Sequence, residues 1–169
     1  AQIDGHSVGI GFDANGNLYF GDDDCIRKID TNDIITTIAG TGTSGHSGDG
    51  GQALSAQINP ASVVIHNGEL FFSEGVWDGV AKNYIRKINL STGIISTIAG
   101  TGPSGFSGDN GPAVSAQIQN ANGIGFDASG NLYFGDAYRI RKIDTNGIIT
   151  TIAGTGTSGH SGDSGQALS

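Results

Sequence analysis

The stretch IDTNDIITTIAGTGTSGHSGDGGQALSAQI, residues 29–58, decides the fold of this chain because it recurs twice. The second copy, INLSTGIISTIAGTGPSGFSGDNGPAVSAQI, covers residues 88–118, and the third, IDTNGIITTIAGTGTSGHSGDSGQALS, covers residues 143–169. The TIAG blocks end at Gly40, Gly100 and Gly154, which gives steps of 60 and then 54 residues. Repeats with periods in this range are typical of propellers, solenoids and other repeat arrays.

Each copy contains four short apolar runs that turn residues separate. In the first copy the runs cover residues 7–13, 17–22, 25–30 and 34–40. Asn, Asp and Gly between the runs, as in Asp13–Gly16, favour tight hairpins because they tolerate positive φ. The runs therefore predict an antiparallel meander. The corresponding strands are predicted at 62–66, 70–74, 84–89 and 94–100 in the second copy, and at 123–127, 131–136, 139–144 and 148–154 in the third.

A short four-stranded meander cannot bury both of its faces alone, so the copies must pack face to face as propeller blades do. We predict an all-β fold of β-propeller blades, three per chain, that form a single propeller-type domain or half-propeller over residues 1–169. The blades are predicted at about 7–40, 62–100 and 123–154, with connectors at 41–61, 101–122 and 155–169. QALSAQ at 52–57 predicts a short helical turn inside the first connector.

The motifs GNLYFGD, IRKID, IITTIAGTG and GHSGDGGQALSAQI resemble NHL repeats, whose bacterial form runs GNLY(I/F)AD, RIRK(I/V), ITTVAGTG and GDGGPA followed by AQL. The resemblance covers all three copies. It implies a propeller that binds proteins or RNA, and related propellers include some lyases and lactonases. The stretch after the second strand departs from the usual ADTGNHRIRK. It is shortened to GDDDCIRK at 21–28 and GDAYRIRK at 135–142, and lengthened to SEGVWDGVAKNYIRK at 73–87.

Three blades are too few to close a ring, since propellers typically carry about 4 to 8. The residues GQALS at 165–169 and AQI at 1–3 together repeat the internal GQALSAQI at 51–58. We therefore expect two copies to associate head to tail as a homodimer and to complete a six-bladed ring. A junction that fails to close would instead give a filament, and a fragment of a longer repeat protein would have the same sequence pattern.

The charge balance excludes some partners. Sixteen acidic residues against eight basic ones give a net charge of -8, the wrong sign for nucleic acid or for an anionic membrane surface. We find no apolar run long enough to insert into a membrane and no leader segment. The single cysteine, Cys25, cannot form an intrachain disulfide. The few lysines and the Ala1-Gln2 start favour a secreted protein, extracellular or periplasmic.

The insertion at 73–84 is the predicted recognition surface. It carries Trp77, Asp78 and Tyr84, and an exposed Trp beside carboxylates suits a protein, peptide or glycan ligand because a rigid ring contributes contact area at low entropic cost. The alternative is that Trp77 folds back and caps its own loop. The corresponding positions of the other copies hold Asp22, Asp23, Asp24 and Tyr138.

The connectors carry a second set of repeated polar residues. His46, Phe106 and His160 occupy equivalent positions, and the exchange of His for Phe favours a packing role over metal binding or catalysis. Three residues later stand Asp49, Asp109 and Asp163, which we predict to accept hydrogen bonds in Gly-rich turns, with calcium binding as the alternative. The Arg-Lys pairs on the third strands, at 27–28, 86–87 and 141–142, are predicted to pair with acidic turns of adjacent blades.

We find no Ser-His-Asp arrangement and no HExxH motif in the sequence. The sequence therefore favours a non-catalytic scaffold that binds a ligand or assembles with itself, with no cofactor except the possible calcium. Two alternatives stay open: a structural subunit of an extracellular filament or repeat array, and a metal-dependent enzyme similar to the propeller lyases and lactonases.

Overall fold

Antiparallel pairing within each repeat produces three sheets, and the computed structural model describes residues 2–3, 9–77, 81–160 and 162–168. The first sheet contains, in spatial and chain order, β1 (Ile10–Phe12), β2 (Leu18–Asp22), β3 (Cys25–Ile29) and β4 (Ile35–Ala39). The second contains β5 (Pro60–His66), β6 (Glu69–Trp77), β7 (Ala81–Asn89) and β8 (Ile95–Pro103). The third contains β10 (Ala121–Phe126), β11 (Leu132–Asp136), β12 (Arg139–Ile143), β13 (Ile148–Ala153) and, at its outer edge, β9 (Gly111–Pro112). The predicted all-β fold of antiparallel four-stranded sheets is confirmed.

An aspartate fixes the first hairpin turn of the third sheet. The Asp127 carboxylate accepts hydrogen bonds from the backbone amides of Ser129 and Asn131, both at 2.9 Å. It also accepts bonds from the Asn131 side chain and from the Tyr133 hydroxyl. These bonds, with the Asn131 side chain foremost, lower the pKa of Asp127 to about 2, so the carboxylate stays charged near neutral pH. Asp13 makes the corresponding bonds in the first sheet, which explains why the same turn forms twice.

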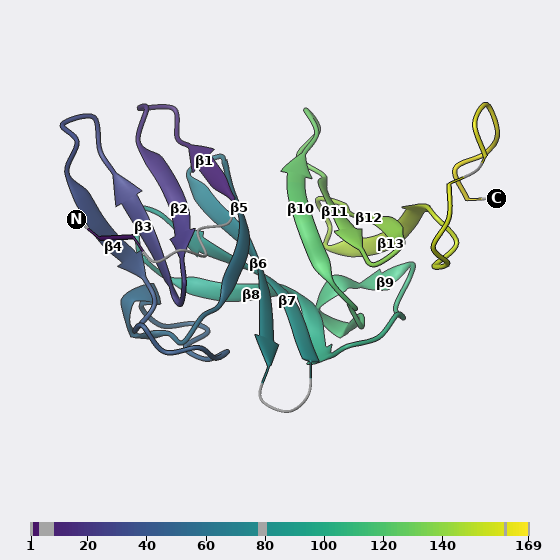
Figure 1. Cartoon of the computed structure of the whole chain (residues 1–169), viewed down its shortest axis with the longest axis horizontal. Helices are drawn as coiled ribbons and strands as arrows, with labels where there is room; N and C mark the ends of the chain where they lie inside the picture. Colours follow the sequence, from purple (N-terminus) through teal and green to yellow (C-terminus); the bar gives the residue numbers. More distant parts are fainter. Residues whose placement is uncertain (1, 4–8, 78–80, 161, 169) are drawn as a thin grey trace.

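The three sheets lie side by side along an arc, and their inner strands β1, β5 and β10 contact one another in sequence (Figure 1). A long connector returns from the outer strand of one sheet to the inner strand of the next. On its way it pairs with the outer strand of that next sheet, through a bridge between Gln52 and Ile94 in the first connector and through β9 in the second. The short 3-10 turns η1 (Ala53–Ser55) and η2 (Ala113–Ser115) follow. The sequence predicted the first of these turns but not the edge pairing.

The apolar core is divided between the two junctions of neighbouring sheets. Large side chains of the first cluster, between the first and second sheets, are Tyr19, Ile26, Ile58, Leu70, Phe72, Ile88 and Ile95. Those of the second cluster, between the second and third sheets, are Phe71, Ile85, Ile118, Leu132, Phe134, Ile143 and Ile149. The second sheet is therefore covered on both faces. This is the face-to-face packing that the repeat pattern required.

Several apolar side chains of the first and third sheets are exposed, although the equivalent side chains of a neighbouring sheet pack in a junction. On the first sheet, Ile10 is 66% and Phe12 is 62% exposed. The equivalent Ile124 and Phe126 of the third sheet pack against the second cluster. On the third sheet, Ile140 is 42% exposed, whereas the equivalent Ile85 is fully buried. The first and third sheets thus each carry an uncovered apolar face.

The insertion at 73–84, expected to be a loop, instead lengthens a hairpin. β6 and β7 pair continuously from Glu69 opposite Asn89 to Trp77 opposite Ala81. β2 and β3, by contrast, end at the pair of Asp22 and Cys25. Val76 and Trp77 belong to the residue types that favour strands, which accounts for the extra pairing. The strands predicted at 70–74 and 84–89 are therefore too short, since β6 continues to Trp77 and β7 begins at Ala81.

Candidate functional site

The turns between second and third strands lie on the same side of the sheets as the connectors, as predicted. We call this side the connector face, and it comprises the described hairpin ends at 22–25, 74–77, 81–84 and 136–139 together with residues 40–59 and 100–120. The Asn59 side chain, at the end of the first connector, donates to Asp24 of the first sheet at 3.3 Å. The Asn59 backbone amide donates to Glu74 of the second sheet at 3.1 Å. One connector residue therefore links two neighbouring hairpin ends.

A buried arginine on the second sheet holds the first connector. Arg86 is fully buried, and its Nη2 donates to the Asp49 carboxylate at 2.6 Å and to the Ser47 carbonyl at 2.7 Å. Its Nη1 donates to the Gln57 carbonyl at 3.2 Å and lies 3.4 Å from the buried Glu74 carboxylate. Arg86 does pair with acidic groups, as predicted for the third-strand basic residues, but these are a connector aspartate and Glu74 of its own sheet rather than a turn of an adjacent blade.

The same arrangement recurs between the second and third sheets. Arg141, also fully buried, donates through Nη2 to Asp109 and to the Ser107 carbonyl, both at 2.8 Å. Through Nη1 it donates to the Gln117 carbonyl at 2.9 Å and to Asp136 at 3.1 Å. We call this arrangement of a buried arginine with a connector's Ser carbonyl and Asp carboxylate the connector lock.

The ring that precedes each lock packs as the exchange of His for Phe predicted. His46 stacks on Tyr84 with ring centroids 3.5 Å apart and planes 6° from parallel. Phe106 packs against Arg139, whose guanidinium carbon lies 3.7 Å from the ring centroid. His46 does more than pack, because its Nδ1 lies 2.5 Å from the buried Glu74 carboxylate.

The structure brings only some of the predicted ligand-binding residues together. Tyr84 lies beside His46, and Asp24 is linked to the same hairpin end through Asn59. Asp22, predicted to lie in a recognition loop, is buried, and its carboxylate accepts a hydrogen bond from Arg27 at 3.1 Å. Asp23 is exposed in the adjacent turn.

Tyr138 lies on the third sheet, 57% exposed, beside a hollow of about 480 Å³ that the third connector lines. Trp77 occupies the last described position of β6, opposite Ala81, at the end of the long hairpin. Asp78 lies outside the described residues. The hairpin that ends at Trp77 is thus longer than the equivalent hairpins of the other two sheets, whose last pairs are Asp22 with Cys25 and Asp136 with Arg139.

Two of the three aspartates considered for calcium are engaged by arginine. Asp49 and Asp109 each bind a lock arginine, so a cation would have to displace a buried guanidinium. Asp163 is exposed. Over the described parts of the chain, we find no group of three or more His, Cys, Asp and Glu side chains placed to hold a metal ion.

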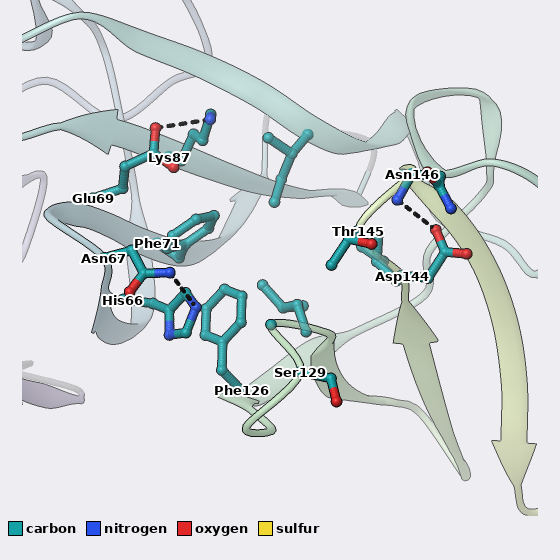
Figure 2. Close-up of a pocket in the computed structure, with 15 residues that line it drawn as sticks. His66, Asn67, Glu69, Phe71, Lys87, Phe126, Ser129, Asp144, Thr145 and Asn146 are labelled. Carbon is teal, nitrogen blue, oxygen red and sulfur yellow. Dashed lines mark hydrogen bonds and ion pairs between the residues drawn. The ribbon is translucent and has the colours of Figure 1, made fainter.

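The opposite side of the sheets carries a groove between the second and third sheets, with a volume of about 580 Å³. Figure 2 shows His66 and Phe126 against each other, and their ring centroids are 4.1 Å apart. Glu69 and Lys87 form an ion pair at 2.8 Å along the same groove (Figure 2). The groove therefore combines an apolar floor with a charged and polar rim, which suits a small polar ligand that has one apolar face.

A second groove, of about 630 Å³, lies between the first and second sheets on that side. His66 and Asn67 line both grooves because the turn after β5 stands between them. Sequence reasoning missed both grooves, and it also missed Glu74 and Asn59. Glu74 had one signal: it is a glutamate where the other copies have an aspartate, Asp22 and Asp136.

The repeats were compared with known proteins. The family model described as the teneurin NHL domain matches residues 101–166, which contain the second 3-10 turn, the whole third sheet and most of the third connector. This match supports the resemblance of the repeats to the NHL-repeat family. Teneurin-1 of Gallus gallus is 32% identical over 168 residues, which cover 91% of this chain and 6% of that protein. The chain thus spans about 6% of the length of this teneurin.

Solved structures show the same fold as these NHL repeats at low identity. A protein of unknown function from Bacteroides thetaiotaomicron aligns with a TM-score of 0.63 at 20% identity, over 88% of this chain and 36% of its own. A streptogramin B lyase aligns with a TM-score of 0.58 at 15% identity, over 89% and 41% respectively. At such identities the likeness concerns the fold alone. None of the helices in the described part of the chain is long and apolar enough to span a membrane.

Proposed function

We propose that this chain is a non-catalytic NHL-type propeller scaffold that binds a protein, peptide or glycan on its connector face and associates with a second copy of itself. The proposal includes an extracellular or periplasmic location. The observation that carries the recognition surface is the long hairpin of β6 and β7, whose strands have nine residues each, whereas β2, β3, β11 and β12 have five.

The base of this hairpin is rigid. Glu74 is buried, bonded to Asn59 and His46, while Tyr84 is held by its stack on His46. Beyond this base the pairing continues to Trp77. A two-stranded extension on a fixed base presents side chains at low entropic cost, which is what a recognition surface requires. The polar side chains around the base are bonded to connectors and sheets, and this supports a scaffold rather than a catalytic centre.

Replacing residues 75–83 by the two-residue turn Asp-Asp of the first sheet should remove ligand binding and leave the fold intact. Two residues would then connect Glu74 to its strand partner Tyr84, as two residues connect Asp22 to its strand partner Cys25 in the first sheet. The measurement is binding of wild type and variant to arrays of immobilised peptides and glycans, with thermal unfolding as the check on stability. Trp77→Ala should weaken binding to the same array members at least about tenfold, since a central aromatic commonly contributes more than about 1.4 kcal/mol.

Ile34→Ala is the control for Trp77→Ala, because Ile34 is an exposed apolar side chain just before β4, at the opposite side of the sheets from the connector face. It should bind as wild type does. Array signals that persist after replacement of the hairpin would place recognition elsewhere. A loss of several degrees in melting temperature for Trp77→Ala, with unchanged binding, would assign the ring a structural role.

Self-association is supported by the complementary faces of the outer sheets. The internal junctions bury the face that carries Ile85 on one sheet against the face that carries Ile124 and Phe126 on the next. The third sheet exposes Ile140, equivalent to Ile85, and the first sheet exposes Ile10 and Phe12, equivalent to Ile124 and Phe126. Covering such side chains contributes about 1.5–3 kcal/mol each. The third sheet of one copy therefore fits against the first sheet of another.

We expect the purified chain to form a closed head-to-tail dimer with twice its mass of 17.1 kDa. Sedimentation equilibrium over a range of concentrations measures this mass and the dissociation constant of the dimer. Ile140→Asp should shift the equilibrium toward the single chain, because a charge would be buried against apolar side chains. A mass of one chain at all concentrations contradicts self-association. Species that grow without limit indicate a filament instead of a ring.

A further inference from the structure

The third connector carries the acidic half of a connector lock. In the first two connectors, Asp49 and Asp109 occupy this half and bind the arginine of the following sheet. The equivalent aspartate of the third connector is Asp163. Asp163 is exposed, and among the described residues the structure gives its carboxylate no arginine partner. Figure 1 shows this connector, in yellow, extending from the third sheet away from the other two.

The loop around Asp163 already has the conformation of the two occupied loops. Gly162 has φ 92°, compared with 86° at Gly48 and 88° at Gly108. Ser164 has φ 67°, close to the 64° of Asn110. The Gly165 amide donates to the Gly162 carbonyl at 2.8 Å, as the equivalent amides do at 3.0 and 3.1 Å in the other two loops. The loop is therefore preorganised for a lock, and ordering it costs little on binding.

The first sheet carries the matching basic half. Arg27 is equivalent to Arg86 and Arg141, and its Nη1 donates to Asp22 at 3.1 Å as Arg141 donates to Asp136 at 3.1 Å. Its Nε is buried without a hydrogen-bond partner among the described residues, as are the Nε atoms of Arg86 and Arg141. The Arg27 side chain is 22% exposed, whereas the two lock arginines are fully buried. Arg27 thus has the position of a lock arginine without the connector that would cover it.

The outer edge of the first sheet is also open. In the occupied junctions, the connector backbone pairs with the next outer strand: the Gly50 amide donates to the Ile95 carbonyl at 2.8 Å and the Ile95 amide to the Gly51 carbonyl at 3.1 Å. The Asp49 carboxylate accepts a further bond from the Thr97 amide at 3.1 Å. The equivalents on the first sheet are Ile35 and Thr37 of β4, and the described part of the first sheet ends at β4 without a fifth strand.

We propose that residues 162–167 of one copy dock on the first sheet of a second copy. Asp163 of the docking copy accepts hydrogen bonds from Arg27 and from the Thr37 amide of the other. The backbone at Ser164 and Gly165 pairs with Ile35 and adds an edge strand to β4, a form of β-augmentation. This inference rests on the proposed self-association and specifies the polar contacts that orient the two copies.

The proposal places position 160 over Cys25. His46 lies over Tyr84 and Phe106 over Arg139, and Cys25 is the first-sheet equivalent of Tyr84 and Arg139. The same arrangement would set His160 of one copy against Cys25 of the other. Since Cys25 is the one cysteine of the chain, it provides a site-specific probe of this contact.

The first test is charge reversal at the new lock. Asp163→Arg should raise the dimer dissociation constant at least about 30-fold, because it sets two positive charges together at a site otherwise buried in the dimer. The double variant Asp163→Arg with Arg27→Asp should recover most of the affinity. Thr157→Arg is the matched control, since it adds a positive charge to the same connector. The equivalent residue of the first connector, Thr43, is exposed even though that connector is held by its lock. Thr157→Arg should change the dissociation constant less than threefold.

The second test does not depend on the fold of a charge-reversed chain. His160→Cys, treated with a short bifunctional thiol reagent at pH about 8.5, should give a covalent dimer. The alkaline pH is needed because burial raises the pKa of the Cys25 thiol. Adding Cys25→Ser should abolish the product, and Thr157→Cys should give far less of it.

The outcomes separate the two proposals. A wild-type dimer that Asp163→Arg weakens no more than Thr157→Arg, and whose position 160 does not crosslink to Cys25, overturns the docking of residues 162–167 and leaves self-association standing. A wild-type chain that stays monomeric overturns both.

Discussion

We expect Arg141→Ala to lower the free energy of unfolding by about 3–5 kcal/mol and the melting temperature by about 10 °C. Arg141 is fully buried and contacts four groups, two of them carboxylates. Its removal leaves Asp136, also fully buried, hydrogen-bonded to the backbone amides of Gln119 and Asn120 but without its arginine. An unpaired buried carboxylate accounts for most of the loss, because burying one charge without its partner is far less favourable than burying the pair.

Urea unfolding at one fixed protein concentration measures this loss, since self-association would add a concentration-dependent term. Lys142→Ala is the control, because Lys142 is adjacent on β12 and only partly buried. It should change stability by less than about 1 kcal/mol. Arg141→Lys should recover only part of the loss, since lysine keeps the charge but cannot donate hydrogen bonds through two nitrogens as a guanidinium does. A loss below about 1 kcal/mol for Arg141→Ala would show that the lock does not hold the sheets together.

Gly100→Ala should destabilise the fold by about 3 kcal/mol, the second large effect that the structure predicts. Gly100 has φ 99°, a backbone conformation that alanine rarely adopts. A Cβ at this position would also lie 2.5 Å from the Asn83 carbonyl oxygen and 3.1 Å from the Tyr84 Cα. Both obstacles are backbone or close to it, so the neighbours cannot yield by a side-chain rotation. The same glycine ends the TIAG block in the other two copies, at Gly40 and Gly154.

Gly75→Ala, in the long hairpin, is the matched control. Gly75 is exposed, has no positive φ, and has nothing within 4 Å of the position where a Cβ would lie. It should change the free energy of unfolding by less than about 0.5 kcal/mol. Equal losses for the two glycines would contradict the assignment of Gly100 to a steric requirement. Thermal unfolding of both variants beside wild type decides between these outcomes.

Local residue chemistry explains why so much of the fold was predictable. Strand positions followed from apolar runs and turn residues, and turns such as that at Asp127 form through bonds between residues at most six apart. Such interactions do not depend on how the sheets are arranged. The repeat itself added the decisive constraint, because three similar meanders can bury their apolar faces only against one another.

The candidate site was less predictable because its partners are distant in sequence. Arg86 binds Asp49, 37 residues away, and Arg141 binds Asp109, 32 residues away. The sequence predicted that basic third strands would pair with acidic turns, but the choice of partner depends on the course of the connectors. His46 and Glu74 are 28 residues apart, and at the other junction the equivalent residues are Phe106 and Asp136, which cannot pair because phenylalanine has no hydrogen-bonding group.

The sequence by itself determined the repeat, the all-β class, the turns and the resemblance to NHL repeats, because these depend on residue types at fixed local spacing. The tertiary structure alone decided that the insertion extends a hairpin, that connectors pair with the outer strand of the next sheet, and that buried arginines join the sheets. The physical reason is that a buried charge or an edge strand is stabilised by whichever group the packing brings to it. Packing brings together segments that no local pattern relates.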